Sequence, residues 1–178
     1  MLTSDIIETP LGPMTAIVNE RGLVLCEFGD CLAERGQVER VQKLFGDTPR
    51  TGAHVFLDQT RDELGGYFAG KRETFTIPLV VAGTPFQEQV WRELLRIPFG
   101  QTASYNEIGS RIGRAGAARA VGRANGDNRM AIIIPCHRVI GANGSLTGYG
   151  GGEDRKRWLL DHEQRGVQMS FTAFGGKA

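Results

Sequence analysis

The chain has 178 residues, of which 40% are hydrophobic and 23% charged, and its formal net charge is +1. These values are typical of a globular protein, with no apolar run near the roughly 20 residues that cross a membrane and no secretory signal in the opening MLTSDIIETP. Three cysteines without a CxxC pair argue against a disulfide framework and predict a cytoplasmic protein.

The first half of the chain alternates short β-prone runs with helical patterns. Met14–Val18 and Leu23–Phe28 flank NERG and predict a hairpin. Apolar residues at helical spacing from Leu32 to Phe45 predict a helical segment that ends at Gly46, and FLDQTRDELGGYFAG predicts another helix. TFTIPLVV predicts a strand. We therefore expect an α+β domain over residues 1–82.

A second, mostly helical domain is expected over residues 83–178. Thr84 is a good N-cap, Pro85 suits the first helical position, and an apolar stripe follows at helical spacing. Residues 104–124 then show a helix, a short turn between Gly113 and Gly116, and a second helix from Ala117 to Ala124. This pattern fits a helix-turn-helix and equally a plain hairpin of two helices.

The second of these helices carries Ala117, Ala118, Arg119, Gly122 and Arg123. Small residues permit close approach to a surface, such as the minor groove, but read little sequence. Arg119 and Arg123 are four residues apart and share one side. Residues 84–163 hold 11 Lys and Arg against 8 Asp and Glu, which favours a polyanionic partner. Tight helix packing and a solvated arginine face are the alternatives.

The segment IIIPCHRVIG places a thiol, an imidazole and a guanidinium beside an apolar run. Cations near Cys136 would favour its nucleophilic thiolate, although neighbours on an extended segment point to opposite faces. A nucleophile also needs a base that a third group orients, and EDRKRWLLDHE predicts a helix that ends in His162 and Glu163. An exposed helix end remains an alternative for Glu163. Cys26 and Cys31 are expected to be buried small hydrophobes.

The motifs taken together resemble a known family of repair proteins. IPCHRVIG followed by GSLTGYGGGEDRKRWLLDHE, together with GTPFQEQVWREL, IPFGQTASYNEIG and GAARAVGRANGDN, is similar to the O6-alkylguanine-DNA alkyltransferases, in the same order. The resemblance implies an RNase H-like α+β domain, then a winged helix-turn-helix (about 104–124) with an active-site loop at 135–152. It also implies irreversible transfer of an alkyl group from O6-alkylguanine, and from O4-alkylthymine, to a cysteine, once per molecule.

The resemblance also implies roles for individual residues. Cys136 is the alkyl acceptor, His137 the base acting through a water, Glu163 its orienter, and Tyr105 the proton donor to departing guanine. The residues expected to contact DNA are Tyr105, Ala117, Ala118, Arg119, Gly122 and Arg123. Arg119 resembles the finger that enters the stack when the damaged nucleotide is flipped out. Asn128 resembles a hinge, and the base pocket is expected at Val139, Tyr149 and Gly150.

Two features depart from the family pattern. Gly150 stands where some relatives carry serine, so only its backbone N–H is available to guanine O6. The zinc ligands of some relatives are missing, because Cys26, Cys31 and His54 lack metal-site spacing. We expect no metal and no cofactor. The expected partner is double-stranded DNA, bound through the minor groove with little sequence preference. Without DNA we expect a monomer, and we expect no membrane partner.

Three functions compete at this point. Alkyl transfer to Cys136 is the first, and a module that binds the DNA lesion without alkyl transfer is the second. The presence of Cys136 counts against the second. A Cys–His hydrolase is the third, disfavoured because no separate oxyanion motif stands out and the predicted DNA helix would have no purpose.

Overall fold

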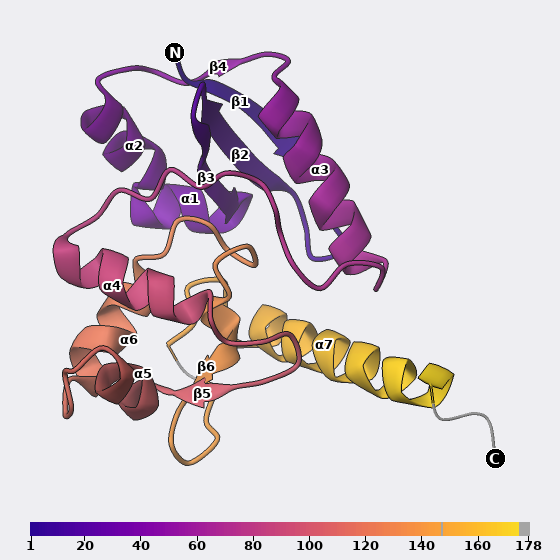
Figure 1. Ribbon diagram of the computed structural model, residues 1–178. Helices are drawn as coiled ribbons and strands as arrows, with labels where there is room; N and C mark the ends of the chain where they lie inside the picture. Colours follow the sequence, from indigo (N-terminus) through magenta and orange to yellow (C-terminus); the bar gives the residue numbers. More distant parts are fainter. Residues whose placement is uncertain (147, 175–178) are drawn as a thin grey trace. The chain divides into compact units, whose positions relative to one another are not determined.

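The computed structural model describes residues 1–146 and 148–174, and of residues 33, 35 and 170–174 the backbone alone. The chain divides into two compact units (Figure 1). The first consists of Met1–Thr84 and the segment Arg129–Ile133, and the second of Pro85–Asn128 and the chain from Ile134 onward. No helix within the described ranges is long and apolar enough to span a membrane.

The first unit is built on a four-stranded sheet. The strands β1, β2 and β3 form an antiparallel meander, and β4 pairs parallel to β1, so the order is β3-β2-β1-β4. The predicted hairpin is confirmed as β2 and β3, and β3 is buried along its whole length. The bounds are Thr3–Ile7 for β1, Met14–Asn19 for β2, Gly22–Phe28 for β3 and Arg50–Thr51 for β4.

Three helices accompany this sheet, namely α1 (Gly29–Arg35), α2 (Gln37–Phe45) and α3 (Val55–Phe68). The helix predicted up to Gly46 is two helices, because Gly36 adopts a left-handed φ of 54° that ends α1 and begins α2. The helix α3 runs along the sheet (Figure 1). The apolar core comprises Leu2, Ile17, Val24, Leu25, Val41 and Val80, with Leu32, Val38 and Phe45 packed against it.

The strand predicted for TFTIPLVV is wrong. The backbone N–H groups of Thr76 and Ile77 donate to the buried Glu63 carboxylate at 2.9 and 3.2 Å instead of to a neighbouring strand. Pro78 has no N–H to offer, and only its carbonyl is used, by the N–H of Leu23 at 2.8 Å. The segment therefore touches β3 through one isolated bridge, Leu23 to Leu79.

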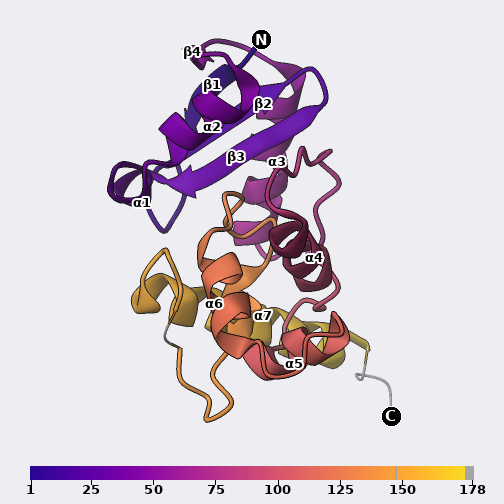
Figure 2. The ribbon, with the colours of Figure 1, turned by 90° about the vertical axis from the view of Figure 1, so that its left-hand side faces the viewer.

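The second unit is mostly helical. Its helices α4, α5 and α6 contact one another (Figure 2), and the indole Nε1 of Trp91 on α4 donates to the carbonyl of Ala124 on α6 at 2.8 Å. The bounds are Pro85–Leu94 for α4, Tyr105–Arg111 for α5, Ala118–Gly126 for α6 and Glu153–Phe174 for α7. Two short strands, β5 (Ala103–Ser104) and β6 (Val139–Ile140), pair in parallel.

The predicted pair of short helices with a glycine turn between them is present as α5 and α6. Ser104 and Glu107 form a reciprocal capping box at the start of α5, which satisfies backbone donors that the helix leaves free. Gly113 and Gly116 in the turn have φ of 72° and 82°, which residues other than glycine adopt at a cost.

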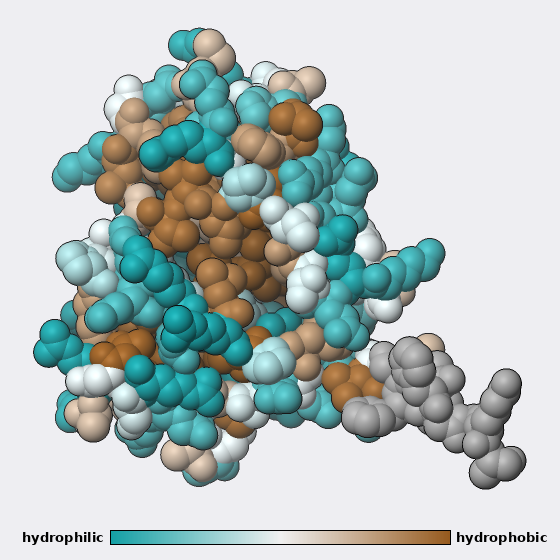
Figure 3. All heavy atoms as spheres, viewed as in Figure 1, coloured by the Kyte–Doolittle hydropathy of each residue, from teal (hydrophilic) through white to brown (hydrophobic). Residues whose placement is uncertain are grey.

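The space-filling view shows hydrophilic side chains gathered over α4 and along the outer side of α3 (Figure 3).

The long helix α7 does not end at His162 and Glu163, as the sequence pattern predicted. It continues through Phe174, and Gly166 lies where an added Cβ would meet the Phe99 ring at 2.9 Å. This glycine therefore allows close packing of the helix on the loop that holds Phe99. Glu163 consequently stands in the interior of a helix and is fully buried, which contradicts the alternative of an exposed helix end.

Candidate active site

Cys136 lies at the start of a 3₁₀ turn, η1 (Cys136–Arg138), and its side chain is buried. The segment is therefore not extended, and the two residues after the cysteine turn toward α7, where both contact Glu163. The Cys26 and Cys31 thiols are also buried, in β3 and α1, as expected. Burial raises the pKa of Cys26 strongly, and the neighbouring Glu27 charge adds to the rise, so that thiol stays neutral.

Two three-residue turns precede the thiol. The N–H of Ile133 donates to the carbonyl of Ala131 at 2.9 Å across Ile132, whose φ is 71°. A γ-turn of positive φ is rare and costs a β-branched residue of order 1–3 kcal/mol. The N–H of Cys136 donates to the carbonyl of Ile134 at 2.7 Å across Pro135, with φ −79° and ψ 62°, which is the common inverse γ-turn.

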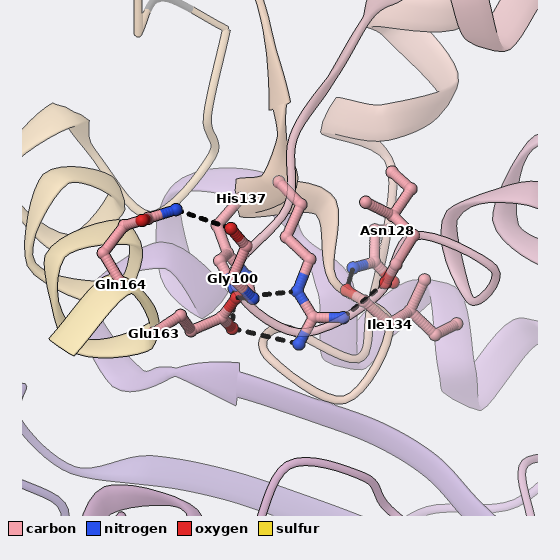
Figure 4. Close-up of polar contacts among 8 residues, drawn as sticks. Gly100, Asn128, Ile134, His137, Glu163 and Gln164 are labelled. Carbon is pink, nitrogen blue, oxygen red and sulfur yellow. Dashed lines mark hydrogen bonds and ion pairs between the residues drawn. The ribbon is translucent and has the colours of Figure 1, made fainter. Parts of the chain in front are cut away.

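Two asparagines near the end of α6 hold the segment that carries the thiol. The side-chain amide of Asn128 donates to the carbonyl of Ile134 at 3.0 Å and to Sγ of Cys136 at 3.0 Å. Figure 4 shows Asn128 beside Ile134. Asn125 donates to the carbonyl of Cys136 at 3.3 Å. Cys136 is thus anchored by its side chain and its backbone, and Asn125 was missed in the sequence.

Glu163 collects hydrogen bonds from three directions (Figure 4). One carboxylate oxygen lies 2.8 Å from Nε2 of His137, and the guanidinium of Arg138 donates to both oxygens at 2.9 and 3.0 Å. The N–H of Gly100 donates at 2.9 Å. Burial favours the protonated acid, but the hydrogen bonds and positive charge of its partners outweigh burial and hold the pKa of Glu163 at about 2. The carboxylate is therefore ionised.

Arg138 was not among the predicted site residues. Its guanidinium is buried and also donates to the carbonyl of Ile97 at 2.6 Å, so it pairs with Glu163 while fixing the 97–100 loop. The usable signal was an arginine set inside an apolar run, because buried arginine is rare unless paired.

His137 is a neutral imidazole with a defined tautomer. Burial lowers its pKa more than the hydrogen bond and charge of Glu163 raise it. Because an ionised carboxylate only accepts hydrogen bonds, the proton sits on Nε2 and Nδ1 is an acceptor. Nδ1 is buried and has no hydrogen-bond partner among the residues that the structure describes. The geometry thus leaves one basic nitrogen available for proton transfer.

Tyr105 begins α5, and burial raises its pKa, with a further contribution from Cys136. A Cβ on Gly148 would lie 2.8 Å from the Tyr105 hydroxyl, so the loop that carries Gly148 passes against the phenol. Thr147 of that loop lies outside the described residues. Tyr149 is buried and the neighbouring Gly150 is exposed. Gly122 of α6 lies against the ring of Tyr105, where a Cβ would be 3.7 Å from the nearest ring carbons.

A second missed residue is Lys156, which is fully buried on α7. Its Nζ donates to the carbonyl of Val139 at 2.5 Å and lies 6.0 Å from the centre of the Tyr105 ring. Burial lowers its pKa to about 8, against the opposing effect of Cys136. The signal was helical spacing, because Lys156, Leu159 and Glu163 share one face at i, i+3 and i+7.

Of the residues predicted to contact DNA, Tyr105 begins α5 and the others lie at and along α6. Arg119 and Arg123 are exposed, whereas Ala117, just ahead of the helix, Ala118 and Gly122 are half-buried. The surface of α6 therefore combines small residues with two exposed arginines on one side. Among the described residues no three His, Cys, Asp or Glu side chains gather as a metal site, and His54 caps α3 by accepting the N–H of Phe56 at 3.2 Å.

Family models match both units of the chain. The 6-O-methylguanine DNA methyltransferase ribonuclease-like domain matches residues 3–81, and the DNA binding domain of the same description matches residues 85–165. These matches confirm the expected ribonuclease-like α+β domain followed by a helical domain.

Whole proteins are similar as well. The methylated-DNA–protein-cysteine methyltransferase of Mycobacterium tuberculosis (strain ATCC 25618 / H37Rv) is 45% identical over 94% of this chain and 96% of its own length. The Shigella flexneri protein of that name is 41% identical over 91% and 95%. The structure of Mycobacterium tuberculosis OGT in complex with DNA superposes with a TM-score of 0.78 at 45% identity over 93% of each chain. The chain belongs to the 6-O-methylguanine DNA methyltransferase family.

Proposed function

We propose that this protein repairs DNA by transferring an alkyl group from O6 of guanine, and from O4 of thymine, irreversibly to Sγ of Cys136. The observation that carries the proposal is the site itself: Asn128 contacts the thiol sulfur at 3.0 Å, beside a neutral His137 that an ionised Glu163 orients at 2.8 Å. Family membership supports the substrate class.

The reaction follows from these groups. His137 Nδ1 takes the thiol proton through an intervening water, and the sulfur attacks the alkyl carbon. A C–S bond forms as the bond from that carbon to O6 breaks, and the electron pair stays on guanine. Tyr105 donates a proton to the departing base and regains one from the imidazolium. The products are intact guanine in DNA and a thioether on Cys136. No cofactor or metal takes part in this sequence of steps.

The partner is double-stranded DNA, bound through the minor groove with little sequence preference. The half-buried Ala117, Ala118 and Gly122 give α6 a thin face, and the exposed Arg123 suits phosphate. Arg119 fills the stack while the damaged nucleotide is flipped out, because the alkyl carbon is inaccessible in a closed duplex. Structural similarity to a relative solved with DNA supports this assignment.

The flipped base is held by Val139, Tyr149 and Gly150, the last through its backbone. Asn128 acts as the hinge between α6 and the active-site loop at 135–152, since its one amide joins Ile134 and Cys136. Residues 1–82 form a domain without catalysis of its own, and residues 83–178 carry the chemistry. We place the protein in the cytoplasm, as a monomer in the absence of DNA.

The test is an intact mass measurement after incubation with duplex DNA containing O6-methylguanine. Transfer adds one methylene to the protein, on the peptide that contains Cys136. Cys136→Ala should bind the same duplex and gain nothing, whereas Cys31→Ala, which removes another buried thiol, should react like the wild type. Binding without a mass gain would favour a lesion-binding module. Repeated turnover of an ester or peptide would favour a hydrolase.

A further inference from the structure

The chain between Asn128 and Ile134 forms a loop that a hydrogen bond closes at its ends and that pairs with strand β3 on one side. The side-chain amide of Asn128 closes it by donating to the carbonyl of Ile134 at 3.0 Å. On the way, the backbone of Cys26 in β3 pairs with the loop: its N–H donates to the carbonyl of Arg129 at 2.8 Å, and its carbonyl accepts the N–H of Ala131 at 2.8 Å. The chain must therefore reverse between Ala131 and Ile134.

The reversal takes place at Ile132. The hydrogen bond from the Ile133 N–H to the Ala131 carbonyl spans this residue, whose φ of 71° is the one positive value at a non-glycine residue of the described chain. Glycine adopts such a φ without steric cost, whereas a β-branched side chain is strained there. The side chain of Ile132 is fully buried, so packing holds it in a conformation that the backbone alone disfavours.

We propose that Ile132 is a positioning residue for alkyl transfer, whose buried side chain locks the strained turn that returns the chain to Asn128 and sets the place of the Cys136 sulfur. The inference rests on the proposed function. Ile132 acts through the residues that follow it: Ile134 comes directly after the turn, and the Asn128 amide joins the Ile134 carbonyl to the Cys136 sulfur. A glycine would relieve the strain but leave the turn free to open.

The position of the sulfur matters because in-line attack on the alkyl carbon requires near-contact geometry. A misplacement of about 1 Å can cost roughly 10²-fold in rate. A second turn, at Pro135, follows at once and is closed by the Cys136 N–H. A change in the backbone of the first turn therefore displaces the sulfur of the nucleophile.

The experiment compares Ile132→Gly, Ile132→Val and Ile133→Ala with the wild type. Ile133→Ala is the matched control, because it removes a neighbouring buried side chain that does not sit at the strained φ. Each protein is mixed in excess with duplex DNA containing O6-methylguanine, and separately with free O6-benzylguanine. The endpoint of the titration gives the active fraction, and the time course gives the rate constant per active molecule.

Positioning predicts that Ile132→Gly lowers this rate constant at least about tenfold on both substrates. Ile132→Val, which keeps the β-branch, and Ile133→Ala should stay within about twofold of wild type, whatever their active fractions. A merely structural role would lower the active fraction and leave the rate constant alone, and that result would overturn the inference. Equal slowing by Ile133→Ala would overturn it too.

Wild-type protein supplies a second measurement in case Ile132→Gly does not fold. A locked turn requires the Ile133 amide proton to exchange with solvent as slowly as the amides of β3, and exchange as fast as in exposed loops would contradict the locking. Failure of the proposed function looks different, because then the wild type itself would gain no methyl group. A reactive wild type with an equally reactive Ile132→Gly would sink the positioning role alone.

Discussion

At the scale of single residues, charge and burial together decide which side chains of the site are ionised. Glu163 is ionised because its hydrogen bonds to His137 and Arg138 and the positive charge beside it outweigh burial, and the contact with His137 also orients that imidazole. In the proposed mechanism Arg138 is a positioning residue, because it acts on His137 through Glu163. Its burial is tolerable because both carboxylate oxygens are within 3.0 Å of its nitrogens, so loss of either partner leaves a charge without compensation.

Replacing Glu163 by glutamine should be costly for both stability and rate. Glu163→Gln leaves the buried Arg138 without a counter-charge, which we expect to lower the free energy of unfolding by about 3 kcal/mol. The tautomer of His137 is no longer fixed, so the transfer rate should fall roughly 10²-fold. Urea melts and single-turnover kinetics measure the two effects. Glu153→Gln, at the exposed start of the same helix, should change stability by less than about 1 kcal/mol.

Acid should destabilise the protein through His137. Its folded-state pKa is lowered by burial, while the unfolded value is about 6.5. The unfolded state therefore binds more protons, and stability is full above about pH 6.5 and declines as the pH falls below it. Melting temperatures between pH 8 and 5 should show this slope in wild type and in His162→Gln, and a smaller slope in His137→Gln. An unchanged slope in His137→Gln would refute the assignment.

At the scale of elements, α6 is expected to serve the duplex and not the chemistry. Arg119→Ala should slow repair of duplex lesions far more than reaction with free O6-benzylguanine, because unstacking costs a few kcal/mol in a duplex and nothing for a free base. Arg123 lies four residues along the same exposed side. Arg123→Ala should weaken duplex binding and reduce the slope of binding affinity against salt concentration by the amount of about one phosphate contact. Equal losses by Arg119→Ala on both substrates would remove its finger role.

Local signals predicted the elements whose ends are set by local chemistry. The start of α4 at Pro85 is confirmed, and Ser104 caps α5 through Glu107 only three residues away, because helix starts depend on neighbouring residues. The TFTIPLVV strand was wrong because Glu63, far away in sequence, takes its N–H groups.

The candidate site was predictable in part for the same reason. The PCHR motif pointed to Cys136 and His137, but no local pattern shows that Arg138 and Gly100 share one carboxylate, because those contacts span long stretches of chain. The left-handed φ of Ile132 could not be predicted either. Positive φ is expected at glycine or asparagine, and here buried packing overrides that preference.

At the scale of the whole molecule, the protein should act once and then weaken. A thioether is a poor leaving group, so titration against lesions should reach a sharp one-to-one endpoint. The added alkyl group crowds a buried site and disturbs the Asn128 contact to sulfur, and overpacking costs typically about 1–3 kcal/mol. The methylated protein should melt at a lower temperature, and larger alkyl groups should lower it more. Cys136→Ala given the same treatment is the control, and unchanged melting would refute the strain argument.

The five residues Arg129–Ile133 belong to the first unit although they lie between Asn128 and Ile134 of the second. The chain therefore passes from one unit to the other three times. The two segments of the first unit, which must match each other, are encoded by separate stretches of the gene. A chimera of two relatives joined at residue 84 would take β3 from one parent and its partner segment from the other. Productive recombinants should be those in which the residues around Cys26 and Met130, which form the bridge, come from the same ancestor.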